Sequence, residues 1–149
     1  MEQLDTYFQT EARKAGKKVC GLETADFQIS VLLGGKTLER QVEELMCLVD
    51  NVEWHAAQAD SLSALYERQD VEGMVRLTEM KLNTACDPRP EELDQFIYDR
   101  NADWLTKMPA IMAGGSTLFV VGAGHLGSGR GVVALLRKAG YDVVPVSYP

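Results

Sequence analysis

The stretch from residue 117 to residue 146 constrains the fold of this chain more than any other part. It opens with an apolar run at 118–121, continues through a loop that holds five glycines between Gly122 and Gly131, and closes with a second, mostly apolar run at 142–146 that begins with Asp142. A helical apolar pattern lies between the loop and Gly140. Apolar, β-branched runs of this length are typical of strands that are buried on both faces. The order of strand, loop, helix and strand therefore predicts part of a parallel sheet.

The rest of the chain extends this pattern. A helical segment at residues 1–15 ends at Gly16 and leads into a strand-like run at 18–22, and residues 36–113 are mostly helical in pattern. We therefore expect a single domain over residues 1–149 with an α/β fold that is rich in helix. Its sheet is predicted to be short and mostly parallel, with strands near 18–22, 117–122 and 142–146 and a long helical insertion at about 36–113.

Charge and composition exclude several classes of function. The net charge of -7 argues against nucleic acid or an anionic membrane as the partner. No apolar run is long enough for a membrane span, and no signal peptide is recognisable. The three cysteines, Cys20, Cys47 and Cys86, lack the spacing of a metal site, and we interpret them as buried free thiols.

Two hypotheses, and a plain structural alternative, compete for the glycine-rich loop. Gly122, Gly124 and Gly127 match the dinucleotide-binding pattern G-x-G-x-x-G, but the acidic residue that should end the next strand is missing, because Asp142 stands at its start. The segment from Gly122 to His125 also matches a G-x-x-H pattern, in which the histidine itself does the chemistry. The third interpretation is a tight turn with an incidental histidine. In every case the loop follows the carboxyl end of a predicted strand, where ligands bind in such folds.

Two polar residues fall on the apolar face of the helix predicted from about residue 91 to 108. Arg100 and Asn101 lie at helical spacing from the apolar residues that precede and follow them. A buried arginine needs an anionic partner, because an unpaired buried charge costs several kcal/mol. Glu23 follows the first predicted strand and is one candidate partner, and the local alternatives are Asp94, Asp99 and Asp103.

A second apolar pattern lies in the helical middle. Six residues keep a 4-3-4-3-4 spacing that suits packing along another helix: Leu38, Val42, Leu45, Val49, Val52 and Ala56. His55 lies beside this seam without a ligand pattern around it, and we interpret it as a helix-surface or core-edge residue. One alternative function follows, a non-catalytic interaction domain that docks or dimerises through residues 38–56.

Taken together, Glu23, Arg100, Asn101 and His125, with the motifs around them, resemble the TraB/GumN family, which includes the TIKI metalloproteases and looks distantly related to erythromycin esterase-like enzymes. The resemblance runs from residues 14–24 (Lys-Ala-Gly-Lys-Lys-Val-Cys-Gly-Leu-Glu-Thr) to residues 135–143. It implies a peptidase- or esterase-like hydrolase that uses Mn, Co or Zn and acts on a peptide or small-molecule substrate.

The resemblance also implies roles for these four residues. His125 would be a metal ligand, and Glu23 a second ligand or the general base that deprotonates the metal-bound water. Arg100 would stabilise an oxyanion or orient Glu23, and Asn101 would bind the substrate or fix the loop. Glu23 and Arg100 also fit a simple internal ion pair, and this alternative stays open.

One departure from the family pattern stands out. The family typically carries two G-x-x-H motifs, and this chain has only the second. Three strands are also few for a sheet covered on both faces. We therefore expect the C-terminal half of a longer protein, weakly active alone and completed by an N-terminal half or by self-association. Bacterial relatives are often exported, but the sequence itself does not predict a compartment.

Overall fold

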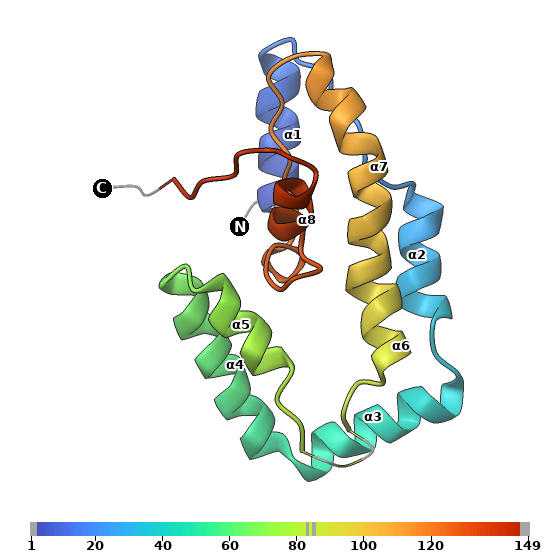
Figure 1. Cartoon of the computed structure of the whole chain (residues 1–149). Coiled ribbons are helices and arrows are strands. Elements are labelled where there is room, and N and C mark those ends of the chain that lie inside the picture. Colours follow the sequence, from blue (N-terminus) through green and yellow to red (C-terminus); the bar gives the residue numbers. More distant parts are fainter. Residues whose placement is uncertain (1–2, 83, 85, 147–149) are drawn as a thin grey trace.

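The computed structural model describes residues 3–82, 84 and 86–146, and in this part of the chain every regular element is a helix. The helices have the following bounds: α1 (Leu4–Lys14), α2 (Ala25–Gly34), α3 (Leu38–Asp50), α4 (Val52–Glu67), α5 (Val71–Thr78), α6 (Pro90–Leu93), η1 (Asp94–Tyr98), α7 (Asp99–Ala113), η2 (Ala123–His125) and α8 (Val132–Lys138). In Figure 1 they form an open U. One arm holds α4 and α5, the other holds α2 and the α6–α7 helix, and α3 forms the base.

Several helix boundaries follow from local sequence chemistry. α2 begins after Thr24, whose side-chain oxygen accepts a hydrogen bond from the Phe27 amide, as expected of an N-cap. α1 ends before Gly16, which adopts a φ of 67° that favours glycine. The predicted helix over residues 1–15 is confirmed from Leu4 onward, and its residues 1–2 lie outside the described part of the chain.

One long helix carries two of the predicted site residues. α6, η1 and α7 follow one another without a break from residue 90 to residue 113, and η1 is a π-helical turn. Such wide turns occur mostly as single insertions in α-helices and often lie near functional sites. Here the π turn ends at Tyr98, two residues before Arg100.

The predicted parallel sheet is wrong for the described residues, since they contain no strand at 18–22, 117–122 or 142–146 or anywhere else. These segments are irregular and do not pair with one another. In residues 118–121, side chains alternate between the two faces of the chain, as they do in a strand. Phe119 and Val121 pack against the core, whereas Leu118 is 70% and Val120 40% exposed. The composition of residues 118–121 predicts a strand that is buried on both faces, but in the structure only the face with Phe119 and Val121 is covered.

The cysteine interpretation is also wrong. Cys47 and Cys86 form a disulfide between α3 and the segment before α6, with their Cα atoms 5.4 Å apart, and Cys20 is exposed. This pairing was not predicted, because the two cysteines are 39 residues apart and their spacing carries no signal of contact.

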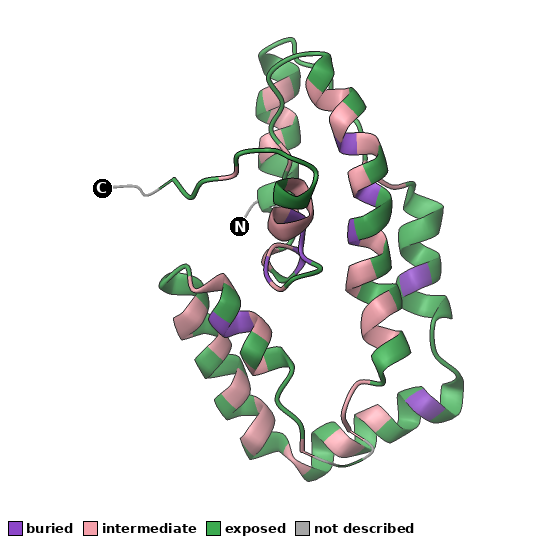
Figure 2. Ribbon diagram, viewed as in Figure 1, coloured by how far each residue is buried: buried purple, intermediate pink, exposed green. Residues whose placement is uncertain are grey.

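The hydrophobic core is small and lies beside the long helix. Trp104 and Met108 of α7 pack with Val132 at the start of α8, and partly buried residues surround them, including Leu22, Phe119 and Val121. Figure 2 shows how few buried residues the helices carry compared with exposed ones. The loop that holds η2 lies between the two arms, where it contacts α5 and η1.

Candidate functional site

Asn101 and His125 form the most deeply buried polar contact among the predicted site residues. The Asn101 side chain has no solvent exposure, and His125 is 7% exposed. The side-chain amide nitrogen of Asn101 donates to the His125 carbonyl oxygen at 3.3 Å and to the Arg130 carbonyl oxygen at 3.0 Å. Because both amide protons are used on carbonyl oxygens, the amide oxygen must face the histidine ring. It lies 2.7 Å from the ring nitrogen Nδ1.

This contact fixes the tautomer of His125. An amide oxygen can only accept a hydrogen bond, so Nδ1 must carry a proton. The pKa of His125 is lowered to about 4, chiefly by burial and also by the positive charge of Arg100, while the negative charge of Glu23 opposes them. At neutral pH the ring is therefore uncharged, and its other nitrogen, Nε2, carries a lone pair.

The Nε2 atom of His125 is also accessible. No described residue forms a hydrogen bond with it. Among the described residues, the single side-chain polar atom that is both fully buried and without a partner is Nε2 of His55. Because His125 Nε2 has no partner either, it cannot be fully buried. His125 thus has an unprotonated ring nitrogen that lacks a hydrogen-bond partner among the described residues, in a residue that is 7% exposed.

Glu23 and Arg100 form a buried ion pair. Arg100 donates from Nε to Oε1 of Glu23 at 2.8 Å and from Nη2 to Oε2 at 2.9 Å, and the Glu23 side chain is only 1% exposed. Two further donors complete its surroundings, Trp104 Nε1 to Oε1 at 2.7 Å and Gln28 Nε2 to Oε2 at 3.3 Å. Burial alone would raise the pKa of Glu23, but these hydrogen bonds and the charge of Arg100 hold it below its usual value.

The structure shows which carboxylate pairs with the buried Arg100. Glu23 is its partner, and the local carboxylates are engaged elsewhere. Asp94 and Asp99 form ion pairs with Arg130, and Asp103 pairs with Lys107.

Trp104 connects the ion pair to the histidine. Its indole nitrogen binds Glu23, while its ring lies against the His125 ring, with the two centroids 4.4 Å apart. The Arg100 guanidinium lies 5.3 Å from the centre of the same indole. The helical spacing of the sequence did not indicate this role for Trp104. Its position four residues after Arg100, on the same helical face, was the available signal.

Packing explains part of the glycine pattern in the loop. A Cβ atom at Gly127 would lie 2.7 Å from Val75 Cγ2 and 2.9 Å from Val71 Cγ1, so the loop touches α5 closely at this point. A Cβ atom at Gly131 would overlap the carbonyl oxygen of Gly127. The seven-residue helix α8 begins only after Gly131. These features give two glycines a structural purpose that does not require a bound pyrophosphate.

The described residues provide an incomplete set of ligands for a metal ion. His125 fits as one ligand through Nε2. Glu23 does not fit as a second in this arrangement, because all four acceptor positions of its carboxylate are occupied. No group of three or more histidine, cysteine, aspartate or glutamate side chains in the described part of the chain is arranged to hold an ion. A catalytic zinc ion needs about three protein ligands.

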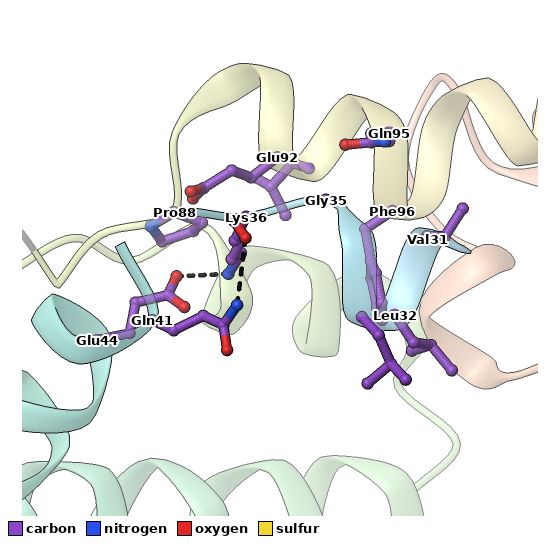
Figure 3. A pocket seen from close by; sticks show the side chains of 12 residues that line it. Val31, Leu32, Gly35, Lys36, Gln41, Glu44, Pro88, Glu92, Gln95 and Phe96 are labelled. Atoms are coloured by element: carbon purple, nitrogen blue, oxygen red, sulfur yellow. Dashed lines mark hydrogen bonds and ion pairs between the residues drawn. The ribbon is translucent and has the colours of Figure 1, made fainter. Parts of the chain in front are cut away.

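A cavity in the described part of the chain lies away from these residues. It has a volume of about 350 Å³ and opens between α2, the start of α3 and the α6–η1 segment (Figure 3). Figure 3 shows Leu32 and Phe96 on its apolar side and the Lys36–Glu44 ion pair on its polar side. A second cavity of about 210 Å³ is lined by Trp54, His55 and residues of α5 and the following segment. Neither cavity includes Glu23, Arg100, Asn101 or His125.

Comparison with known proteins agrees with the motifs. A family model described as the TraB/PrgY/gumN family matches residues 1–145. The chain belongs to the TraB/PrgY/gumN family. The resemblance inferred from the motifs around Glu23, Arg100, Asn101 and His125 is thereby confirmed at the level of the family. No match was found among curated proteins or among solved structures.

Membership of the TraB/PrgY/gumN family leaves the activity to be argued from the site. None of the helices in the described residues is long and apolar enough to cross a membrane.

Proposed function

We propose that this TraB/PrgY/gumN chain is part of a metal-dependent hydrolase that cleaves a peptide or ester bond, and that His125 is its contribution to the metal site. The observation that carries the proposal is the fixed tautomer of His125. Asn101 holds the proton on Nδ1, and Nε2 is left unprotonated, unbonded and in contact with solvent. Histidines that bind metals are commonly held in this way by a hydrogen bond to the other ring nitrogen.

The low pKa of His125 favours a ligand over a general base. A general base works best when its pKa lies near the pH of the reaction, and a pKa of about 4 is far below neutrality. The same low pKa helps a ligand, because protons do not compete with a metal ion for Nε2 at neutral pH. A metal ion bound there would supply a Lewis acid that activates a water molecule.

Glu23, Arg100 and Asn101 act as positioning residues in this proposal. Asn101 selects the tautomer and joins the His125 loop to α7. The Glu23–Arg100 pair holds the indole of Trp104, which supports one face of the histidine ring. The other metal ligands come from outside the described residues, either from another segment of a longer polypeptide or from a second copy.

Thermal unfolding with added metal ions tests this proposal. We expect millimolar Mn²⁺, Co²⁺ or Zn²⁺ to raise the melting temperature, because a ligand that binds only the folded state stabilises it. The rise should disappear in His125→Ala. The control is His55→Ala, which removes the other histidine, whose Nε2 is buried, and should keep the response.

Three outcomes would count against the proposal. One is the absence of any metal response in the unmodified chain, and another is a response that persists in His125→Ala. The third is a rise with NAD but not with metal ions, which would favour the dinucleotide hypothesis for Gly122, Gly124 and Gly127.

A further inference from the structure

The helix α3 turns its polar face toward the rest of the chain and its apolar face toward solvent. Arg40 is 5% exposed although it is charged. Its Nε donates to Glu92 Oε1 at 2.8 Å, and its Nη2 donates to the Asp87 carbonyl oxygen at 2.9 Å. The pKa of Glu92 falls to about 2, chiefly because of the hydrogen bond from Arg40. Cys47, two turns further along, is tied to Cys86 by the disulfide.

The opposite face of α3 is a continuous apolar surface that no described residue covers. At 100° per residue, this face carries the residues that we name the α3 stripe: Leu38, Val42, Leu45 and Val49. Their exposed fractions are 72%, 50%, 58% and 60%. Met46 and Leu48 flank the stripe and are 51% and 47% exposed. Amphipathic helices normally bury such a face, so this orientation indicates a partner.

The total surface of the chain supports the same conclusion. A compact monomer of 16.5 kDa is expected to expose about 7,500 Å². This chain exposes 10823 Å². The excess of about 3,300 Å² leaves room for a partner, and the α3 face accounts for part of it.

We propose that the α3 stripe is the contact surface for a second copy of this chain, paired antiparallel about a two-fold axis. The stripe has a 4-3-4 spacing that is the same in both directions. In an antiparallel pair, Leu38 therefore faces the partner's Val49, and Val42 faces the partner's Leu45. Each contact joins one larger and one smaller side chain, as good helix packing requires. The same patch serves both copies, which is the arrangement of a closed dimer.

The flanking residues and the area agree with self-pairing. In this register Glu39 lies near the partner's Met46, and Gln41 lies near the partner's Leu48, so no like charges oppose each other along the stripe. The stripe with Met46 and Leu48 offers roughly 600 Å² per copy, so the pair reaches the lower end of specific interfaces at roughly 1,200 Å². A membrane surface fits less well, because membrane-bound amphipathic helices carry lysine and arginine beside the apolar face, whereas Glu39 and Asp50 border this one.

Sedimentation equilibrium over a range of concentrations tests the interface. We expect the unmodified chain to form a reversible dimer. Leu45→Glu should raise the dissociation constant by about a hundredfold or more, since the charge enters the interface twice. Leu45 is exposed in the single copy, so helix content measured by circular dichroism should not change. Leu118→Glu is the matched control, because Leu118 is as exposed but lies outside α3, and it should leave the dimer intact.

Cross-linking tests the register independently of these charge changes. In a Cys20→Ser background, a mixture of Leu38→Cys and Val49→Cys chains should form an intermolecular disulfide on mild oxidation. Neither variant should cross-link alone, because their Cα atoms would be too far apart. The proposal is overturned by a monomer at all concentrations, by a dimer that Leu118→Glu breaks and Leu45→Glu does not, or by self-cross-linking of a single variant. These readouts do not depend on metal binding by His125.

Discussion

Replacing Glu23 by alanine is expected to lower the free energy of unfolding by about 3–5 kcal/mol, which is the usual cost of removing one member of a buried ion pair. The change leaves Arg100, whose side chain is 12% exposed, without its anion, and it removes the acceptor of the Trp104 indole. Urea unfolding at neutral pH measures the loss. A loss of this size is a large fraction of the stability of an ordinary domain.

The effect of Glu23→Ala should depend on pH in a defined direction. The pKa of Glu23 is lowered in the folded chain, so its stabilising contribution is complete above its ordinary pKa. The contribution is lost as the pH falls through the lowered value. The difference between Glu23→Ala and the unmodified chain should therefore shrink in acid.

Asp103→Ala provides the matched control for the ion pair. It breaks a pair with Lys107 on the same helix, but both side chains are more than 40% exposed. Exposed pairs contribute about 0–1 kcal/mol, so this variant should unfold almost as the unmodified chain does. Equal losses for Glu23→Ala and Asp103→Ala would contradict the buried pair described here.

Asn101→Leu is expected to cost about 3 kcal/mol or more, because each buried polar group left without a partner costs about 1–3 kcal/mol. Leucine has the same number of side-chain heavy atoms in the same branched arrangement, but no polar atoms. The substitution removes the acceptor of the His125 Nδ1 proton and the donor to the carbonyl oxygens of His125 and Arg130. Urea unfolding again measures the loss.

Asn101→Asp separates the tautomer from the packing. A carboxylate can still accept from Nδ1, and its negative charge should raise the pKa of His125 from about 4 toward its ordinary value. NMR titration of the histidine ring measures this shift. If Asn101→Leu cost less than about 1 kcal/mol, or if Asn101→Asp left the pKa unchanged, Asn101 would not hold His125 as described.

The sequence predicted the polar part of the site better than the fold. Helical spacing places Arg100 and Asn101 on one inward face, and the cost of an unpaired buried charge requires an anionic partner, for which Glu23 was one of four candidates. These contacts depend on local periodicity and on a strong pairwise requirement, both of which a sequence displays. The position of the Trp104 indole between Glu23 and His125 depends on side-chain orientation, which spacing alone did not resolve.

The sheet failed as a prediction because a strand is defined by its neighbours. Leu118 and Val120 have the composition of a buried strand, but composition does not say which surface covers them. In this chain they are exposed, and the segment does not pair with residues 18–22 or 142–146. The disulfide between Cys47 and Cys86 was missed for a related reason, since contacts between distant residues leave no periodic signal.

The helical seam was predicted in position but not in length or surroundings. The sequence suggested a run through residues 38–56, whereas Asn51 separates α3 from α4 and the two helices diverge in Figure 1. The residues of the α3 stripe keep their predicted spacing on the first helix alone. The hypothesis of a docking or dimer seam remains a prediction that sedimentation can test.

The most direct test of the site is to determine the protonation and tautomer of the two imidazole rings. Long-range ¹H–¹⁵N NMR at neutral pH, with and without Zn²⁺, measures both. We expect His125 to be neutral with its proton on Nδ1, to stay neutral until the pH falls to about 4, and to show a Zn²⁺-dependent shift at Nε2. His55, whose Nε2 is buried, should not respond to the metal ion. A proton on Nε2 of His125, or an Nε2 resonance that Zn²⁺ does not move, would contradict the account.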